Sequence, residues 1–114
     1  MIKRILLIML LSSILHAEEE RSNIYERSCV PCHRYLPSSL EGMFMAYLKT
    51  FSGEYTFKAS LRAFLKEPKE ETSVMSTLFV ERFSVKDKTT LSDKELEDAI
   101  NIYWDMYDVR GKLQ

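Results

Sequence analysis

The chain has 114 residues, a length typical of one domain, and 46% of them are hydrophobic and 29% charged. This composition excludes a disordered protein, and the length excludes a solenoid array. The formal net charge is only −1, so the composition gives no indication of nucleic-acid binding.

Residues 1–17 have the layout of a secretory signal peptide. Lys3 and Arg4 form a basic start, residues 5–15 are nearly all apolar, and Ala17 precedes the acidic run that begins at Glu18. The apolar run is much shorter than the about 20 residues that a membrane-spanning helix needs. The alternatives are an uncleaved N-terminal anchor and a buried helix. Cleavage after Ala17 would leave residues 18–114 as one domain, with two basic residues fewer and a formal charge of −3.

The rest of the chain is predicted to be helical. Apolar residues recur at helical spacing over residues 39–50 and 56–66, and shorter helices are expected over residues 19–29 and 74–83. Residues 84–90 are polar and are expected to form a loop. No segment alternates with period two over the length of a strand. The sequence therefore predicts an all-α domain.

The last predicted helix has the clearest start. Ser92 and Glu95 match a capping box, in which each side chain bonds the other residue's free backbone N–H. Leu91 and Leu96 occupy the positions of a hydrophobic staple. From Leu96 to Tyr107, apolar residues then recur along one face of the helix.

The most specific feature of the chain is the run Cys29-Val30-Pro31-Cys32-His33. It contains both cysteines of the chain, and a histidine follows the second one directly. Two thiols at this spacing can each add to one vinyl group of a haem, and the adjacent histidine can bind the iron. Cys-x-x-Cys-His is the signature of c-type haem attachment. The sequence therefore predicts one covalent haem c, bound by Cys29, Cys32 and His33.

Three other uses of this run compete with haem attachment. A disulfide between Cys29 and Cys32 would close a very small loop and would stabilise the fold little. A thioredoxin-like redox pair is expected near a βαβ pattern, which the sequence does not indicate. A structural zinc site takes four ligands, whereas residues 18–114 offer two cysteines and His33, without a second pair.

A bound haem also needs a group on the side opposite His33, which is the last histidine in the sequence. Two histidine ligands within one chain are excluded if the signal peptide is removed. The remaining candidates are Met43, Met45, Met75 and Met106, or an open site. Three of these methionines lie on predicted helices, where methionine usually packs in the core. Met75 follows a polar stretch and is far enough along the chain to wrap the haem edge, so it is the predicted second iron ligand.

Three features occur in the order that they have in one protein family. Tyr25 lies four residues before Cys29, the helical run 64–68 ends in Pro68 ahead of Met75, and the segment 91–103 forms the start of a C-terminal helix. With these features the chain resembles a small monohaem cytochrome c of the soluble class I type. The resemblance implies a cytochrome c-like fold of about four to five helices around one covalently bound haem.

The resemblance also implies residues that support the haem. A proline carbonyl accepts a hydrogen bond from the ligand histidine, and Pro37 is the candidate. A tyrosine hydroxyl, from Tyr47 or Tyr55, can donate to the ligand sulfur. The cationic side chains that can bond a propionate are Arg34, Lys58 and Arg62. Two glycines that are usual in the family are replaced here, by Arg21 and Arg34.

The resemblance implies an electron carrier and not an enzyme, and the predicted signal peptide indicates the periplasm as its location. It would exchange one electron at a time with redox partner proteins, and would meet the membrane only transiently or through a partner complex. One alternative is a haem enzyme or ligand sensor with an open sixth position. Another is a dedicated cytochrome subunit of a larger periplasmic oxidoreductase. For that role, Tyr103, Trp104 and Tyr107 are candidates for a docking surface, with core packing as their other use.

Overall fold

The computed structural model describes residues 24–108, and within them it contains helices and connecting segments but no strand. The predicted all-α class is therefore confirmed. The elements are a helical stretch over residues 24–28, α2 (Val30–His33), α3 (Leu40–Thr50), α4 (Glu54–Lys66), the 3-10 turn η1 (Glu70–Thr72), α5 (Thr77–Phe83) and α6 (Asp93–Tyr107). The predicted signal peptide, Arg21 and the first part of the predicted helix 19–29 lie outside the described residues. Between residues 24 and 108, no helix is long and apolar enough to cross a membrane.

Local capping explains where several helices begin. The predicted capping box is present at α6, where the Ser92 hydroxyl accepts from the Glu95 N–H at 3.2 Å and the Glu95 carboxylate accepts from the Ser92 N–H at 3.1 Å. Ser39 caps α3 in the simpler way, since its hydroxyl accepts from the Gly42 N–H at 3.0 Å. Each of these bonds satisfies a backbone donor that the helix itself leaves free.

Two helix boundaries differ from the prediction. Helix α4 begins at Glu54, two residues early, because Gly53 takes the capping position and the Glu54 carboxylate pairs with Lys58 one turn later at 2.7 Å. Helix α5 begins at Thr77 rather than at residue 74, because the Ser76 hydroxyl caps it by accepting from the Phe79 N–H at 3.2 Å. The polar stretch before it contains the turn η1, which the sequence analysis did not predict.

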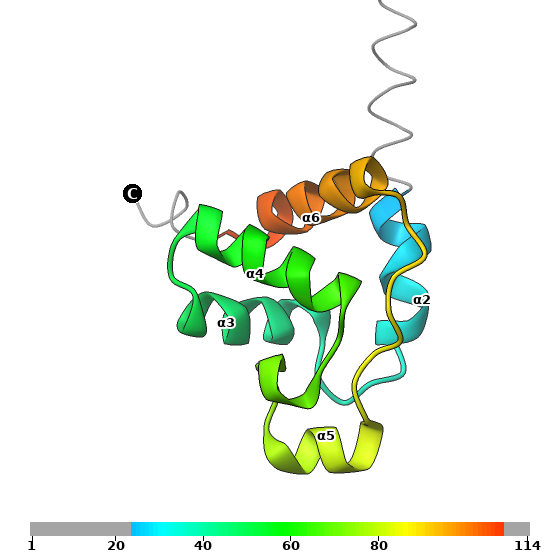
Figure 1. Cartoon of the computed structure of the whole chain (residues 1–114), viewed down its shortest axis with the longest axis vertical. Helices are drawn as coiled ribbons and strands as arrows, with labels where there is room; N and C mark the ends of the chain where they lie inside the picture. The colour runs from blue at the N-terminus through cyan, green and yellow to red at the C-terminus, as the bar shows by residue number, and fades with distance from the viewer. Residues whose placement is uncertain (1–23, 109–114) are drawn as a thin grey trace, which may run out of the picture.

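Helices α3, α4 and α6 pack together around an aromatic core (Figure 1). Phe44 on α3 and Phe57 on α4 are completely buried, and their ring centres lie 4.7 Å apart. Phe44 also meets the Tyr103 ring edge-on at 5.3 Å, and Phe57 meets the Trp104 ring at 5.0 Å. Such ring pairs contribute about 0.5–1.5 kcal/mol each beyond their buried area. The Tyr103 hydroxyl donates to the Leu40 carbonyl and so joins α6 to the start of α3.

The core shows whether the aromatic residues of the last helix form a docking surface or pack inside the fold. Tyr103 and Trp104 are buried, and Tyr107 is partly buried against the same cluster. The proposal that these three rings form a docking surface is therefore wrong, because their faces are covered by α3 and α4. They hold the fold together instead.

Helix α5 lies apart from the three-helix core (Figure 1). It ends at Ser84, which has φ 60° and ψ −177° and is the one non-glycine residue with a positive φ between residues 24 and 108. This region of backbone space is occupied almost entirely by glycine, and another residue there carries strain on the order of 1–3 kcal/mol.

Ser84→Gly is expected to raise the free energy of unfolding by about 1 kcal/mol, since relief of the strain outweighs the extra freedom that glycine has in the unfolded chain. Urea unfolding followed by circular dichroism measures the change. Ser84→Ala is the control, because it removes the same hydroxyl and keeps the strained backbone. Equal stabilities of the two variants would show that the backbone at residue 84 is not strained.

Candidate functional site

One cavity, called the main cavity because it holds the residues singled out above, has a volume of about 640 Å³ and is lined by Cys29, Cys32, His33 and Met75. Most of its other walls are apolar side chains from α3, α4, α6 and the segment from residue 73 to 91. Pockets that hold cofactors or other small molecules measure about 300–1,000 Å³. The cavity therefore brings the four residues singled out in the sequence to a single space of suitable size.

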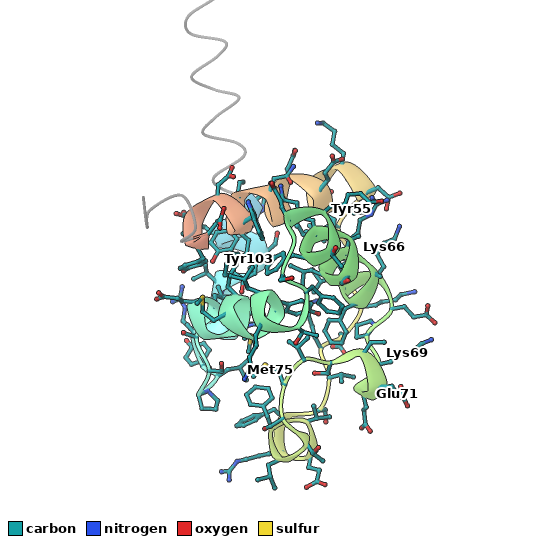
Figure 2. All side chains as sticks on the ribbon, turned by 90° about the vertical axis from the view of Figure 1, so that its left-hand side faces the viewer. Tyr55, Lys66, Lys69, Glu71, Met75 and Tyr103 are labelled. Atoms are coloured by element: carbon teal, nitrogen blue, oxygen red, sulfur yellow. The ribbon has the colours of Figure 1, made fainter. Side chains whose placement is uncertain are left out.

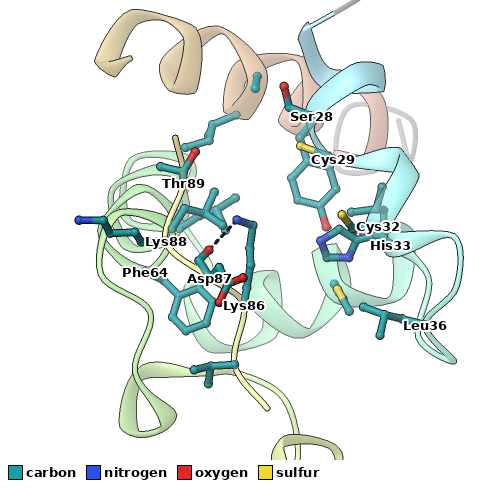
Figure 3. Close-up of a pocket in the computed structure, with 18 of the residues that line it drawn as sticks. Ser28, Cys29, Cys32, His33, Leu36, Phe64, Lys86, Asp87, Lys88 and Thr89 are labelled. Atoms are coloured by element: carbon teal, nitrogen blue, oxygen red, sulfur yellow. Dashed lines mark hydrogen bonds between the residues drawn. The ribbon is translucent and has the colours of Figure 1, made fainter. Parts of the chain in front are cut away.

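Helical backbone geometry directs the Cys-x-x-Cys-His run into this cavity. The Cys29 N–H donates to the Tyr25 carbonyl at 2.9 Å, and the His33 N–H donates to the Cys29 carbonyl at 3.3 Å. Residues three and four apart on a helix share one face. The side chains of Cys29, Cys32 and His33 therefore leave the backbone on the same side, as Figure 3 shows. Both cysteines carry free thiols.

The surroundings of His33 favour its neutral form. Burial lowers the pKa of His33 below its ordinary value of 6.5, and the positive charge of Lys86 lowers it further. The imidazole is therefore neutral at pH 7, which is the state in which histidine binds a metal. Its Nδ1 atom is buried and has no hydrogen-bond partner among the described residues.

The two cysteines of the run differ in exposure. Cys32 is exposed, whereas Cys29 is half-buried and packs against the aromatic core. Burial raises the pKa of the Cys29 thiol, although the charge of Lys86 acts in the opposite direction. Cys29 therefore carries its hydrogen at neutral pH, as the addition of an S–H group to a carbon–carbon double bond requires.

The geometry also bears on the zinc alternative. Within the part of the chain that the structure describes, no three His, Cys, Asp or Glu side chains gather closely enough to hold a metal ion. A zinc ion beside Cys29 and His33 would thus lack the ligand set of a structural site.

The structure separates the four methionines that were candidates for the second iron ligand. Met43 on α3 and Met75 ahead of α5 line the main cavity. Met45 and Met106 are 45% and 46% exposed and are not among its lining residues. The prediction of Met75 as ligand is thus one of two possibilities that the cavity offers, and Met43 is the other. A hydrogen bond from the Met75 N–H to the Ser73 hydroxyl, 3.2 Å long, holds the backbone there.

Of the two tyrosines expected to support the ligand sulfur, Tyr47 lines the cavity and Tyr55 does not. Tyr47 is 6% exposed, and its buried hydroxyl has no partner among residues 24–108. Burial raises the pKa of Tyr47 to about 12, so the hydroxyl keeps its hydrogen and remains a donor. Tyr55 is 85% exposed on the surface of α4 (Figure 2), so Tyr47 is the one of the two alternatives that lies at the cavity.

The three cations that were candidates for bonding a propionate lie outside the main cavity. None of Arg34, Lys58 and Arg62 is among the described residues that line the main cavity. Lys58 pairs with Glu54 at 2.7 Å and lies over the Trp104 ring at 5.7 Å, on the core side of α4. The sequence showed these residues as cations on helices, but it did not show which way each helix face turns.

Pro37 and Arg34 line a second groove, which the imidazole of His33 also reaches. No bond from His33 Nδ1 to the Pro37 carbonyl forms among the described residues. The expected support of His33 by Pro37 is therefore not seen in this geometry.

Sequence reasoning missed Lys86 as a residue of the site. Lys86 lies in the loop that was predicted over residues 84–90, and it lines the main cavity. The Thr89 N–H donates to the Leu65 carbonyl at 2.8 Å, which fixes this loop to the end of α4. Figure 3 shows the Lys86 ammonium on the side of the cavity that faces His33, while Lys88 directs its ammonium away. The sequence signal was only the short charged run 86–88 in an otherwise uncharged loop.

No protein-family model, no curated protein and no solved structure matches the chain. The functional argument therefore depends on the residues that line the cavity.

Proposed function

We propose that this protein is a one-electron carrier that binds a single c-type haem in the main cavity. The observation that supports this most strongly is that Cys29, Cys32 and His33 line one apolar cavity together with Met43 and Met75. Such a protein exchanges electrons with its partners and does not itself make or break bonds in a substrate.

The residues present fit a haem in three respects. The cavity has the volume of a cofactor pocket, its walls are mostly apolar, and its donors are two free thiols and one neutral imidazole. Each cysteine thiol would add across the double bond of one vinyl group, so that sulfur would bond one carbon and the thiol hydrogen would go to the other. This addition consumes no oxidant and no reductant.

Each residue of the site would then have its own role in holding the haem. His33 would hold the iron through its neutral imidazole and Met75 would hold it through its sulfur, a pairing of ligands that raises the reduction potential. The apolar walls exclude water and thereby favour the less charged, reduced state. When bound, the haem iron supplies the site that gains and loses the electron.

The proposed setting follows from the N-terminal sequence. Residues 1–17 have the layout of a signal peptide, and c-type haem attachment takes place after export, so we propose a periplasmic protein. Its partners would be periplasmic redox proteins. Complexes of this kind are small in area and short-lived, which allows rapid turnover.

The test is to produce the full chain in cells that have haem-attachment machinery. We expect the mass of the intact, denatured chain to increase by one haem, because thioether bonds survive denaturation. We also expect a low-spin spectrum that changes reversibly as one electron is added, and a weak far-red band in the oxidised state that indicates a sulfur ligand.

A chain produced in this way without covalent haem would overturn the proposal. A high-spin spectrum that shifts on addition of carbon monoxide or cyanide would instead point to an open sixth position. The protein would then belong with haem enzymes or ligand sensors rather than with electron carriers.

A further inference from the structure

Lys86 lines the main cavity, whereas three other lysines of the fold form ion pairs on the surface. Lys66 pairs with Asp93 at 2.7 Å, Lys69 with Glu67 at 3.4 Å and Lys94 with Asp98 at 3.8 Å, and all of these pairs lie on the surface. The ammonium of Lys86 contacts the Asp87 backbone carbonyl at 2.8 Å and pairs with no carboxylate among the described residues.

The positive charge of Lys86 reaches into the main cavity. Lys86 lines this cavity together with Cys29 and His33, which belong to the opposite wall. Figure 3 agrees with this placement, since the ammonium lies on the side of the cavity that faces His33. The cavity thus has thiols and an imidazole on one wall and an unpaired cation on the other.

A ligand that fills the cavity would remove water from this cation. An ammonium that loses water without gaining an anion is strongly disfavoured, whereas a charge-assisted bond to a carboxylate compensates for the loss. A haem carries two propionate carboxylates and is otherwise apolar at its edge.

We infer that Lys86 is a carboxylate-recognition residue, and that its ammonium binds a propionate of the haem in the main cavity. The inference rests on the proposed function, because it requires that the cavity hold a haem. Lys86 is a positioning residue, which orients the cofactor and keeps its propionate ionised without touching the iron. Its bond would also tie the loop over residues 84–90, which lines the cavity, to the haem.

Lys86 shares the cavity with other charged groups that could bind a carboxylate. Arg27 also lines the cavity, and its charge adds to the lowering of the Glu95 pKa on α6, which the bonds to Ser92 mainly cause. The charged and titratable groups that line the cavity with Lys86 are three tyrosines and Arg27, Cys29, Cys32, His33, Asp87 and Lys88. Lys88 is the natural comparison, because it carries the same charge in the same loop and points away from the cavity (Figure 3).

The experiment compares holoproteins that carry Lys86→Gln, Lys86→Arg or Lys88→Gln with the parent protein. The reduction potential of each is measured as a function of pH. Protonation of a propionate removes negative charge near the iron, so the potential rises as the pH falls through the pKa of that propionate. A bond to Lys86 keeps this pKa low, and opposite charges at such distances lower a carboxyl pKa by about 1–3 units.

We therefore expect the rise in potential to begin about 1–3 pH units higher in Lys86→Gln than in the parent. Lys88→Gln should follow the parent curve, and Lys86→Arg should restore it because the charge is retained. Circular dichroism of all variants should be the same, since residue 86 lies in an exposed loop.

Matching curves for Lys86→Gln and Lys88→Gln would overturn the inference and leave the haem assignment intact. Loss of the far-red band or a change of spin state in Lys86→Gln would also overturn it, because Lys86 would then act at the iron. A parent protein without covalent haem would overturn the proposed function, and this inference with it.

Discussion

A chain with Cys29→Ala and Cys32→Ala together is expected to carry no covalent haem after production with the attachment machinery. The two thiols are the only groups in the sequence that can form thioether bonds at this site, and the structure places both on the wall of the main cavity. Each single variant should keep one thioether bond and therefore some haem. Haem staining after denaturing electrophoresis, with the intact mass, measures the result.

The control for this experiment is the fold of the chain before haem is attached. Neither cysteine is in a disulfide, and Cys32 is exposed, so their removal should leave helix content unchanged by circular dichroism. Cys29 packs at the edge of the aromatic core, so a small loss of stability, about 1 kcal/mol, is expected there. Covalent haem in the double variant would refute the attachment site, and an unfolded apoprotein would assign the cysteines a structural role instead.

Met75→Ala is expected to abolish the far-red band of the oxidised protein. It is also expected to lower the reduction potential by about 0.1 V or more, which is a part of the range of about 0.8 V over which axial ligands set the potentials of haem proteins. The loss of the thioether sulfur leaves the iron without the ligand that stabilises its reduced state. Spectroelectrochemistry of the variant and the parent, at one pH, gives both readouts.

Two other methionines make this result specific. Met45 is 45% exposed and does not line the cavity, so Met45→Ala should match the parent in both readouts. Met43 lines the cavity and is the competing ligand. If Met43→Ala loses the band and Met75→Ala keeps it, the assignment of the iron ligand passes from Met75 to Met43 on α3.

The helices could be predicted because their signals are local. The period of apolar residues predicted α3 and α4, and the residues of the α6 capping box stand within one turn of each other. The starts of α4 and α5 were displaced by two or three residues, because Gly53 and Ser76 took the capping positions. The strain at Ser84 could not be predicted, since serine in a loop gives no sign of a positive φ.

The site was predictable only where its residues are neighbours in sequence. Cys29, Cys32 and His33 fall on one side of a helical turn, and this follows from their spacing alone. Tyr55 and Tyr47 could not be told apart, because their burial depends on how α3 and α4 pack. Lys86 reaches the cavity because a long-range bond, from Thr89 to Leu65, fixes the course of its loop. No local pattern encodes that bond.

The aromatic core and the main cavity depend on different parts of the chain, and this suggests an order of maturation. Helices α3, α4 and α6 bury Phe44, Phe57 and Trp104 without help from α5, which stands apart. Segments with few buried contacts open at the lowest cost in free energy. In the chain without a cofactor, amide hydrogens in α5 should therefore exchange with solvent sooner than those in the core. Because Phe79 and Phe83 of α5 line the main cavity, a haem of the proposed kind would be admitted on this side while the core stays folded.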